Sequence, residues 1–214
     1  DLAVARALGE GEDVVRIMSI HKSKGLEFPL VFVADLGKQI NLQDSRGLLL
    51  CHKALGIGPF VTNPELRYRY PTLARHAIAH QLNMETKAEE MRILYVALTR
   101  AREKLVLVGT VSKLAERAKV WCQAAGSAVR QLPDGLLAGA KTYLDWLGPA
   151  LVRHTAGERL RELAGWEGVL AADWSDVPSD WRLELYPAAA LTDPAATDPA
   201  AWPFMEQVRR LEPV

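Results

Sequence analysis

The chain has 214 residues, of which 49% are hydrophobic and 24% are charged, and its formal net charge at neutral pH is zero. This composition is typical of a globular protein with one core or slightly more than one. A zero net charge excludes a protein that is basic over its whole surface, so any nucleic-acid binding has to come from a local patch. The sequence shows no signal peptide and no apolar run long enough to span a bilayer.

Two apolar runs near the beginning of the chain predict buried strands. They are Val14–Ile20 and Leu30–Ala34, and the second follows Pro29. Nearly continuous apolar runs of this kind favour a parallel sheet that is covered on both faces. Residues 37–72 show no helical period, and their short apolar runs between glycines and prolines predict an irregular β extension.

A long helix is expected from about Thr72, which can cap it, to Arg102. The positions predicted to share its buried stripe are Leu73, Ala77, His80, Met84, Met91, Leu94, Tyr95 and Leu98. Lys104–Thr110 then predicts a third strand. A helix that leads into a strand is typical of an α/β layer, which is the fold class we expect.

The second half of the chain is expected to be mainly helical. Helices are predicted at Lys113–Ala125, at Leu137–Val152 and at residues 158–165, followed by a late strand at Trp181–Tyr186. Residues 187–214 are rich in Ala, Pro, Thr and Asp, which predicts a linker or a tail.

A short polar turn from His21 to Glu27 follows the first expected strand, at the kind of sheet edge where ligands of α/β proteins bind. Lys22 and Lys24 can neutralise phosphates, and Gly25 allows a ligand to approach the backbone closely. Glu27 can accept hydrogen bonds from two ribose hydroxyls, and His21 can donate to a phosphate oxygen. The alternative is a solvated loop in which Glu27 forms a surface ion pair.

Two arginines, Arg100 and Arg102, stand at the end of the long helix. A guanidinium group is a planar fork that suits phosphate. An arginine that reaches from one domain to a γ-phosphate held by another stabilises the transferring charge. The alternative is an arginine that complements the helix macrodipole. Upstream, Glu89 and Glu90 are expected on a solvated face.

Other kinds of site are not indicated by the sequence. It contains no G-x-x-x-x-G-K-[ST] loop and no acidic pair placed to hold Mg²⁺ after an apolar strand, so the chain alone should not hydrolyse ATP. His76 and His80 have the spacing of a zinc motif, but Ala77 stands where the motif needs glutamate, and no metal site is expected. Cys51 and Cys122 are far apart and are expected to be reduced, as in a cytosolic protein.

Two longer segments resemble the UvrD/RecB-like superfamily of ATP-dependent DNA helicases. Residues 15–29 resemble motif V and residues 89–101 resemble motif VI, in the order and at the separation of a second RecA-like domain. Further segments resemble the AddA family of bacterial helicase–nuclease proteins: Leu36–Lys38, Leu55–Gly58, Pro64–Arg67, Tyr70–Leu73 and Tyr143–Leu147. The resemblance covers residues 14–155.

The resemblance implies a role in nucleotide binding for several residues. Arg100 would reach the γ-phosphate of ATP bound on the first RecA-like domain, so we expect its guanidinium to face outward, free of permanent internal contacts. Glu27 would lie near the ribose, and Lys24 and Gly25 would couple the nucleotide surface to the DNA surface. Tyr95 would pack motif VI against the sheet.

The resemblance also implies a DNA-binding surface and a set of partners. His21 would contact the backbone of single-stranded DNA, together with Lys22 and Ser23. The implied partners are single-stranded DNA and duplex ends, the first RecA-like domain of the same chain and an AddB-type protein, in the bacterial cytoplasm and away from any membrane. The implied cofactors are ATP and Mg²⁺, the metal being held by residues outside this chain.

The domain organisation follows from these observations. Residues 1–110 would be the C-terminal half of the second RecA-like domain, 111–186 a helical extension, and 187–214 a linker toward a nuclease domain. The chain begins with Asp1 and lacks an Asp…Glu-x-Lys nuclease core, so we expect a piece of a DNA helicase and exonuclease that acts in double-strand-break repair and recombination. The alternatives are a non-catalytic DNA-binding or subunit-docking module, and a structural domain that binds only protein.

Overall fold

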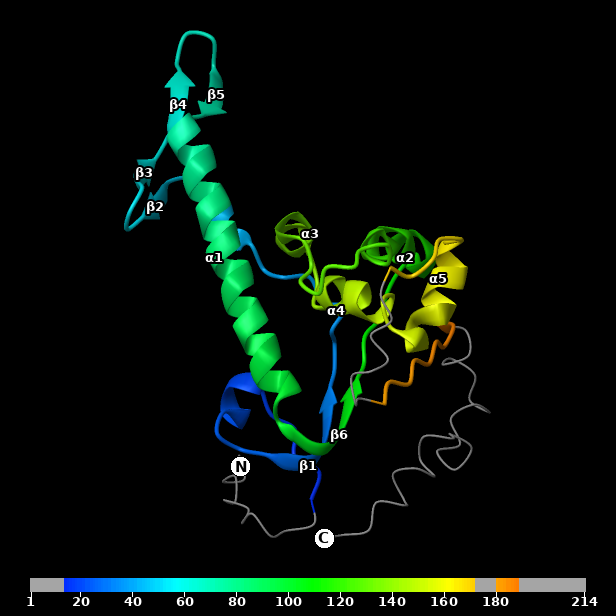
Figure 1. Ribbon diagram of the computed structural model, residues 1–214. Coiled ribbons are helices and arrows are strands. Elements are labelled where there is room, and N and C mark those ends of the chain that lie inside the picture. The colour runs from blue at the N-terminus through cyan, green and yellow to red at the C-terminus, as the bar shows by residue number, and fades with distance from the viewer. Residues whose placement is uncertain (1–13, 172–179, 189–214) are drawn as a thin grey trace.

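The computed structural model describes residues 14–171 and 180–188 (Figure 1). The expected linker lies outside these ranges, apart from its first two residues. No helix in the described ranges combines the length and the apolar character that crossing a bilayer requires.

Two parallel strands form the sheet of a small α/β core. Strand β1 (Phe28–Val33) pairs in parallel with β6 (Ala101–Leu107), and the register shifts near Pro29, which has no N–H to donate. Helix α1 (Leu73–Leu98) leads into β6, so the expected α/β class is confirmed, and so are the strands expected at Leu30–Ala34 and Lys104–Thr110, each with its bounds shifted by a few residues.

The strand expected at Val14–Ile20 is wrong. Residues 14–19 pair with no strand in the described part of the chain, and a short 3₁₀ helix, η1 (Ile20–Ser23), follows them. Val15 and Ile17 are 95% and 98% exposed. An apolar run becomes a strand only where a neighbour takes up its backbone hydrogen bonds, and periodicity alone carries no information about that neighbour.

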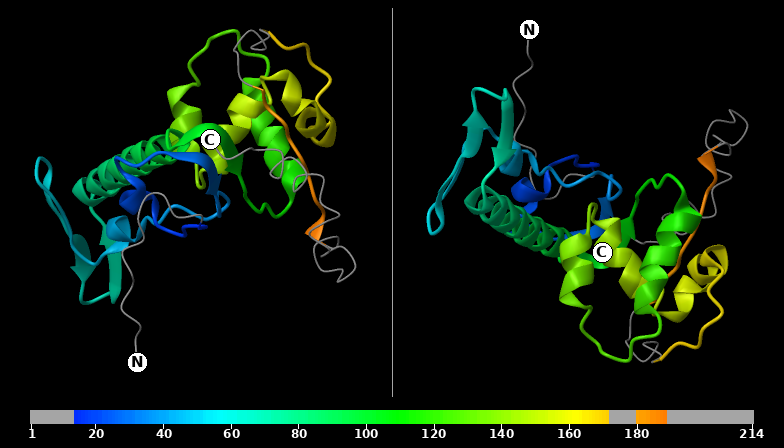
Figure 2. Two further views of the ribbon diagram at one scale, coloured as in Figure 1. Left: turned by 90° about the horizontal axis from the view of Figure 1, so that it is seen from below. Right: turned by 90° about the horizontal axis from the view of Figure 1, so that it is seen from above.

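Two antiparallel hairpins form the expected β extension. They follow η2 (Gln43–Arg46): β2 (Leu50–His52) pairs with β3 (Gly56–Gly58), and β4 (Phe60–Asn63) pairs with β5 (Tyr68–Pro71). We call residues 48–73, which contain both hairpins, the arm. The arm lies at the N-terminal end of α1, away from the α/β core, in all three views (Figures 1 and 2).

Helix α1 begins where Thr72 was expected to cap it, with the Oγ1 of Thr72 accepting a hydrogen bond from the backbone N–H of Arg75 at 3.1 Å. The expected stripe is wrong at several positions, since Leu73 and Tyr95 are 86% and 68% exposed. The start of α1 packs on the arm and its end on the sheet, so no single stripe describes it. The positions buried in α1 are Arg75, Ile78, Leu94 and Ala97.

The helical extension follows β6. It contains α2 (Leu114–Trp121), η3 (Cys122–Ala124), α3 (Asp134–Gly139), α4 (Leu144–Leu151), η4 (Thr155–Gly157) and α5 (Glu158–Ala164). The helices expected at Lys113–Ala125 and 158–165 are confirmed. The single helix expected at Leu137–Val152 is wrong, because the chain breaks between α3 and α4. The late strand expected at Trp181–Tyr186 is also wrong, since no residue of this range belongs to a strand.

The break before α4 has a local cause. The Asp145 carboxylate accepts hydrogen bonds from the backbone N–H groups of Lys141 (2.9 Å) and Thr142 (3.1 Å). It also pairs with Arg117 at 3.0 Å and accepts from the indole of Trp121 at 3.2 Å. Asp145 therefore fixes the start of α4 and binds it to α2.

Two hydrophobic clusters make up the core. One joins the strands, the end of α1 and Trp146; the other lies within the helical extension, around Trp121 and Val152, and Leu144 packs against both.

Cys51 is exposed and Cys122 is buried, and they form no disulfide. Burial raises the pKa of the Cys122 thiol.

Candidate functional site

The turn between η1 and β1 is held by short-range hydrogen bonds. The N–H of Leu26 donates to the carbonyl of Ser23 at 3.0 Å, and the N–H of Lys22 donates to the carbonyl of Ser19 at the same distance. Gly25 has a φ of +83°, in the left-handed region that side chains rarely adopt. The sharp turn toward β1 therefore requires glycine at this position.

The expected site residues of this turn differ in exposure. His21, Lys22, Lys24 and Glu27 are exposed, as a surface for a polyanion requires. Ser23 is only 7% exposed, and its hydroxyl donates to the carbonyl of Ile20 at 2.7 Å. The Ser23 hydroxyl is therefore used to close η1, and the expected contact of Ser23 with DNA stays a prediction.

Arg100 is partly buried and bonded to three internal acceptors. Its Nε donates to the carbonyl of Val96 at 2.9 Å, its Nη1 to the carbonyl of Leu26 at 2.9 Å, and its Nη2 to the hydroxyl of Thr99 at 3.0 Å. The expectation of a guanidinium free of internal contacts is therefore wrong. A guanidinium has five N–H groups, so one on each terminal nitrogen remains for another acceptor.

Two hydrogen bonds join Arg100 to the end of the turn and the start of β1, across more than 70 residues of sequence. The first is the bond from Arg100 to the Leu26 carbonyl, and the second runs from the N–H of Phe28 to the carbonyl of Arg100 at 2.9 Å. The structure thus brings the two expected motifs together. They meet at the amino ends of β1 and β6 (Figure 1). Most ligand sites of α/β proteins lie at the carboxyl ends of the strands, and the sequence predicted that position for this site.

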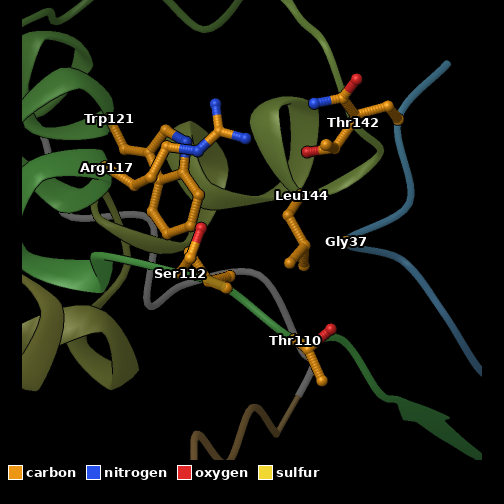
Figure 3. Close-up of a pocket in the computed structure, with 9 residues that line it drawn as sticks. Gly37, Thr110, Ser112, Arg117, Trp121, Thr142 and Leu144 are labelled. Atoms are coloured by element: carbon orange, nitrogen blue, oxygen red, sulfur yellow. The ribbon is translucent and has the colours of Figure 1, made fainter.

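A polar cavity of about 110 Å³ lies at the carboxyl ends of these strands (Figure 3). Figure 3 shows Arg117 and Trp121 of α2 on one side of it and Thr142 on the other. The hydroxyl of Thr142 is buried and has no hydrogen-bond partner among the described residues. The cavity is large and polar enough for ordered water, and no motif in the sequence indicated it.

The middle of α1 is bound to the helical extension by contacts that sequence reasoning missed. The Tyr143 hydroxyl donates to the carboxylate of Glu90, and the Lys87 ammonium donates to the carbonyl of Ala138. Burial, together with the bond to Glu90, raises the pKa of Tyr143. Glu90 is therefore not a solvated residue, in contrast to its neighbour Glu89, which forms an exposed ion pair with Arg92 at 2.7 Å.

Metal ligands do not gather in the described part of the chain. No group of three or more His, Cys, Asp or Glu side chains is placed to hold an ion there. His76 and His80 are both exposed on α1.

Comparison with known proteins links this geometry to a family. The sequence pattern of UvrD-like helicase C-terminal domains matches residues 5–112, a range that contains both the turn and Arg100. A protein of Heliobacterium modesticaldum is 50% identical over 238 residues, which cover 100% of this chain and 17% of that protein. A protein of Pelotomaculum thermopropionicum is 49% identical over 214 residues, with the same two coverages.

A third relative, from Desulforamulus reducens, is 53% identical over 183 residues, or 86% of this chain and 15% of that protein. Each of the three is named as one component of an ATP-dependent helicase/nuclease, which confirms the resemblance to AddA. The chain spans about a sixth of the length of these curated relatives. With half of its residues matched by the family pattern, the chain belongs to the UvrD-like helicase C-terminal domain family.

Proposed function

We propose that this chain supplies one wall of the ATP site, together with a contact surface for single-stranded DNA, in the AddA-type component of an ATP-dependent DNA helicase and nuclease. The names of the relatives support the parent activity. The observation that carries the proposal is the pair of hydrogen bonds that join Arg100 to Leu26 and Phe28 of the motif V segment (residues 15–29). This pair links the residue proposed for the nucleotide to the segment that carries the residues proposed for DNA.

On the nucleotide side, Arg100 and Glu27 face a triphosphate held by the first RecA-like domain. The three present acceptors of Arg100 are neutral oxygens. A phosphate oxygen is charged and forms stronger hydrogen bonds with a guanidinium, so it outcompetes a carbonyl when the two domains close. The partial exposure of Arg100 and its two remaining N–H groups fit this role. Glu27 is exposed beside it and accepts from ribose hydroxyls.

On the DNA side, His21 and Lys22 present their exposed side chains from η1 to the phosphate backbone. Lys24 and Gly25 lie between these residues and the Leu26 carbonyl that Arg100 holds. A change in the contacts of Arg100 therefore acts on the same short turn that carries the DNA-binding side chains. This is the coupling that a translocating motor needs.

The parent protein uses ATP and Mg²⁺, with the metal held by residues outside this chain, and acts on single-stranded DNA and duplex ends in the bacterial cytoplasm. It works in double-strand-break repair and recombination with an AddB-type partner. This chain alone lacks a Walker A loop and a nuclease core, so it is inactive by itself.

One observation favours a second candidate, a non-catalytic DNA-binding or docking module. The internal hydrogen bonds of Arg100 are those of a structural arginine. The two candidates make opposite predictions for the full-length protein, because a non-catalytic module hydrolyses no ATP.

The test is ATP hydrolysis by the full-length protein, with and without single-stranded DNA, beside the 214-residue chain. We expect DNA-stimulated hydrolysis by the full-length protein and none by the chain. Full-length protein that binds single-stranded DNA without hydrolysing ATP would favour the non-catalytic module.

A further inference from the structure

We propose that the arm is the docking surface for the second protein of the complex, and that the contact face of this partner is apolar with an acidic rim. The proposal rests on the proposed function in two respects, since it requires that a second protein exists and that the nucleotide-binding domain lies at the Arg100 end of α1. The arm exposes more large apolar side chains than any other described stretch of the same length. Its exposed apolar residues are Leu48, Leu49, Leu55, Ile57, Val61, Leu66, Tyr68, Tyr70 and Leu73.

The arm is held rigidly although its outer surface is open. Arg75, only 6% exposed, donates to the carbonyls of Gly47, Leu48 (3.1 Å) and Gly58 (3.4 Å). Its guanidinium also lies 4.0 Å from the centre of the Phe60 ring. One buried arginine thus joins the segment before β2 to both hairpins, and a surface fixed in advance loses little entropy when it binds.

Two further contacts fix the first hairpin to α1. A Cβ at Gly58 would lie 2.7 Å from the Cα of Arg75, so β3 packs directly on the helix backbone. The His52 ring bonds to Glu85 of α1 at 3.1 Å, while its Nδ1 accepts from the N–H groups of Ala54 and Leu55, each at 3.2 Å.

The composition of the arm is that of an interface core. Its residues include one Lys, one Glu and no Asp, but two Arg, two Tyr and one Phe. Protein interfaces are enriched in Tyr, Phe and Arg and depleted in Lys, Glu and Asp. The cations Lys53, Arg67 and Arg69 outnumber the single carboxylate of Glu65, a net charge of +2 in a chain whose total is zero. Acidic side chains around the partner's apolar face complement this charge.

The chemistry of the arm favours a separate protein over the other occupants. Seven of the nine exposed apolar residues are aliphatic, whereas surfaces for single-stranded nucleic acid use aromatic rings and cations. A second copy of this chain would bring two basic arms together. In the proposed function the nucleotide-binding domain lies at the Arg100 end of α1, and the 26 residues of α1 place the arm about 40 Å from that end (Figure 1).

The test measures the affinity between the full-length protein and its separately purified partner protein. The variant is Leu66→Asp, at a tip residue that is 66% exposed, and the matched control is Val129→Asp, at a residue 65% exposed outside the arm. We expect Leu66→Asp to weaken the complex at least tenfold, and Leu66→Asp combined with Ile57→Asp to weaken it about a hundredfold. The control should bind as the wild type does.

A second variant tests the charge of the partner. Arg67→Glu should slow association several-fold at low salt and reduce its salt dependence, with little change in dissociation. Wild-type affinity in the Leu66→Asp/Ile57→Asp variant overturns the proposal.

Two other outcomes also overturn it. A fall in the melting temperature of the isolated full-length protein with Leu66→Asp, and none with Val129→Asp, would show that its own domains cover the arm. Weaker single-stranded DNA binding at unchanged affinity for the partner would assign the arm to nucleic acid. ATP hydrolysis by the wild-type protein, measured in parallel, tests the proposed function separately.

Discussion

The two ends of α1 differ in how their arginines are used. At the N-terminal end, Arg75 is buried, bonded to three carbonyls and stacked on Phe60, and it holds the arm as a rigid unit. At the C-terminal end, Arg100 also has three acceptors but is only partly buried and keeps two N–H groups for another acceptor. Similar local bonding is therefore found in a buried clamp in one place and, in the other, in a residue that we propose exchanges its partners.

The sequence predicted a functional role for Arg100 and none for Arg75. Arg100 lies in a motif that resembles a known family pattern. Arg75 lies at the start of a helix, where an exposed side chain is the usual expectation. Burial of Arg75 depends on carbonyls of Gly47, Leu48 and Gly58, which the hairpins bring together only in three dimensions.

The largest expected effect concerns Arg100. In the full-length protein, Arg100→Ala should lower the rate of ATP hydrolysis by a factor of about 10³ or more, since it removes charge from the transferring phosphate. Single-stranded DNA binding should stay within about threefold of wild type. The matched control, Arg102→Ala, changes an exposed arginine two residues away and should keep normal turnover. If Arg100→Ala instead lowers the stability and leaves ATP turnover per folded molecule normal, Arg100 is a structural residue like Arg75, and the contrast between the two arginines is contradicted.

The next effect is on stability, at the junction of α2 and α4. Asp145→Ala removes an ion pair to Arg117, a bond to Trp121 and the acceptor for two backbone N–H groups. We expect a loss of about 3 kcal/mol, because a partly buried guanidinium is left without its partner. Equilibrium unfolding followed by tryptophan fluorescence measures it. Asp134→Ala, at an exposed position of α3, serves as the control, and equal losses in both variants would argue against this role of Asp145.

A smaller effect is expected where the helical extension holds the middle of α1. Tyr143→Phe removes the hydrogen bond to Glu90 and should cost about 1 kcal/mol. The pKa of Tyr143 is raised in the folded state, so its hydroxyl stabilises the fold below the ordinary tyrosine pKa, and this contribution is lost as the pH rises above about 10. Unfolding between pH 8 and pH 11 should therefore show a steeper loss in wild type than in Tyr143→Phe; parallel curves would contradict the assignment.

The smallest effect is expected on the DNA side of the turn. His21→Ala should weaken binding of single-stranded DNA a few-fold and make its salt dependence shallower, because one phosphate contact is lost. Titrations at several salt concentrations measure both quantities. His76→Ala, at an exposed histidine of α1, is the control, and a salt slope identical to wild type would remove His21 from the phosphate contacts.

Local signals predicted those elements whose cause lies in nearby residues. Thr72 caps α1 as its side chain suggested, Gly25 takes the left-handed conformation of a sharp turn, and the apolar runs at β1 and β6 form paired strands. The resemblance implied only that Arg100 and Glu27 both serve the nucleotide, and the hydrogen bonds that join Arg100 to Leu26 and Phe28 come from the structure.

Two of the failures arise where a distant partner, present or absent, decides the outcome, and the broken helix has a local cause. Val14–Ile20 is apolar enough for a strand but has no strand partner among the described residues. The continuous helix expected at Leu137–Val152 is broken because Asp145 captures the backbone before α4. The expectation that Arg100 is free of internal contacts failed because the Leu26 carbonyl, far away in sequence, accepts its hydrogen bond.

The most direct test measures ATP hydrolysis and affinity for the partner protein together in two variants of the full-length protein, Arg100→Ala and Leu66→Asp. We predict that Arg100→Ala loses hydrolysis and keeps the partner, and that Leu66→Asp loses the partner and keeps DNA-stimulated hydrolysis by the isolated protein. Hydrolysis within tenfold of wild type in Arg100→Ala would contradict the central claim that this guanidinium completes the ATP site.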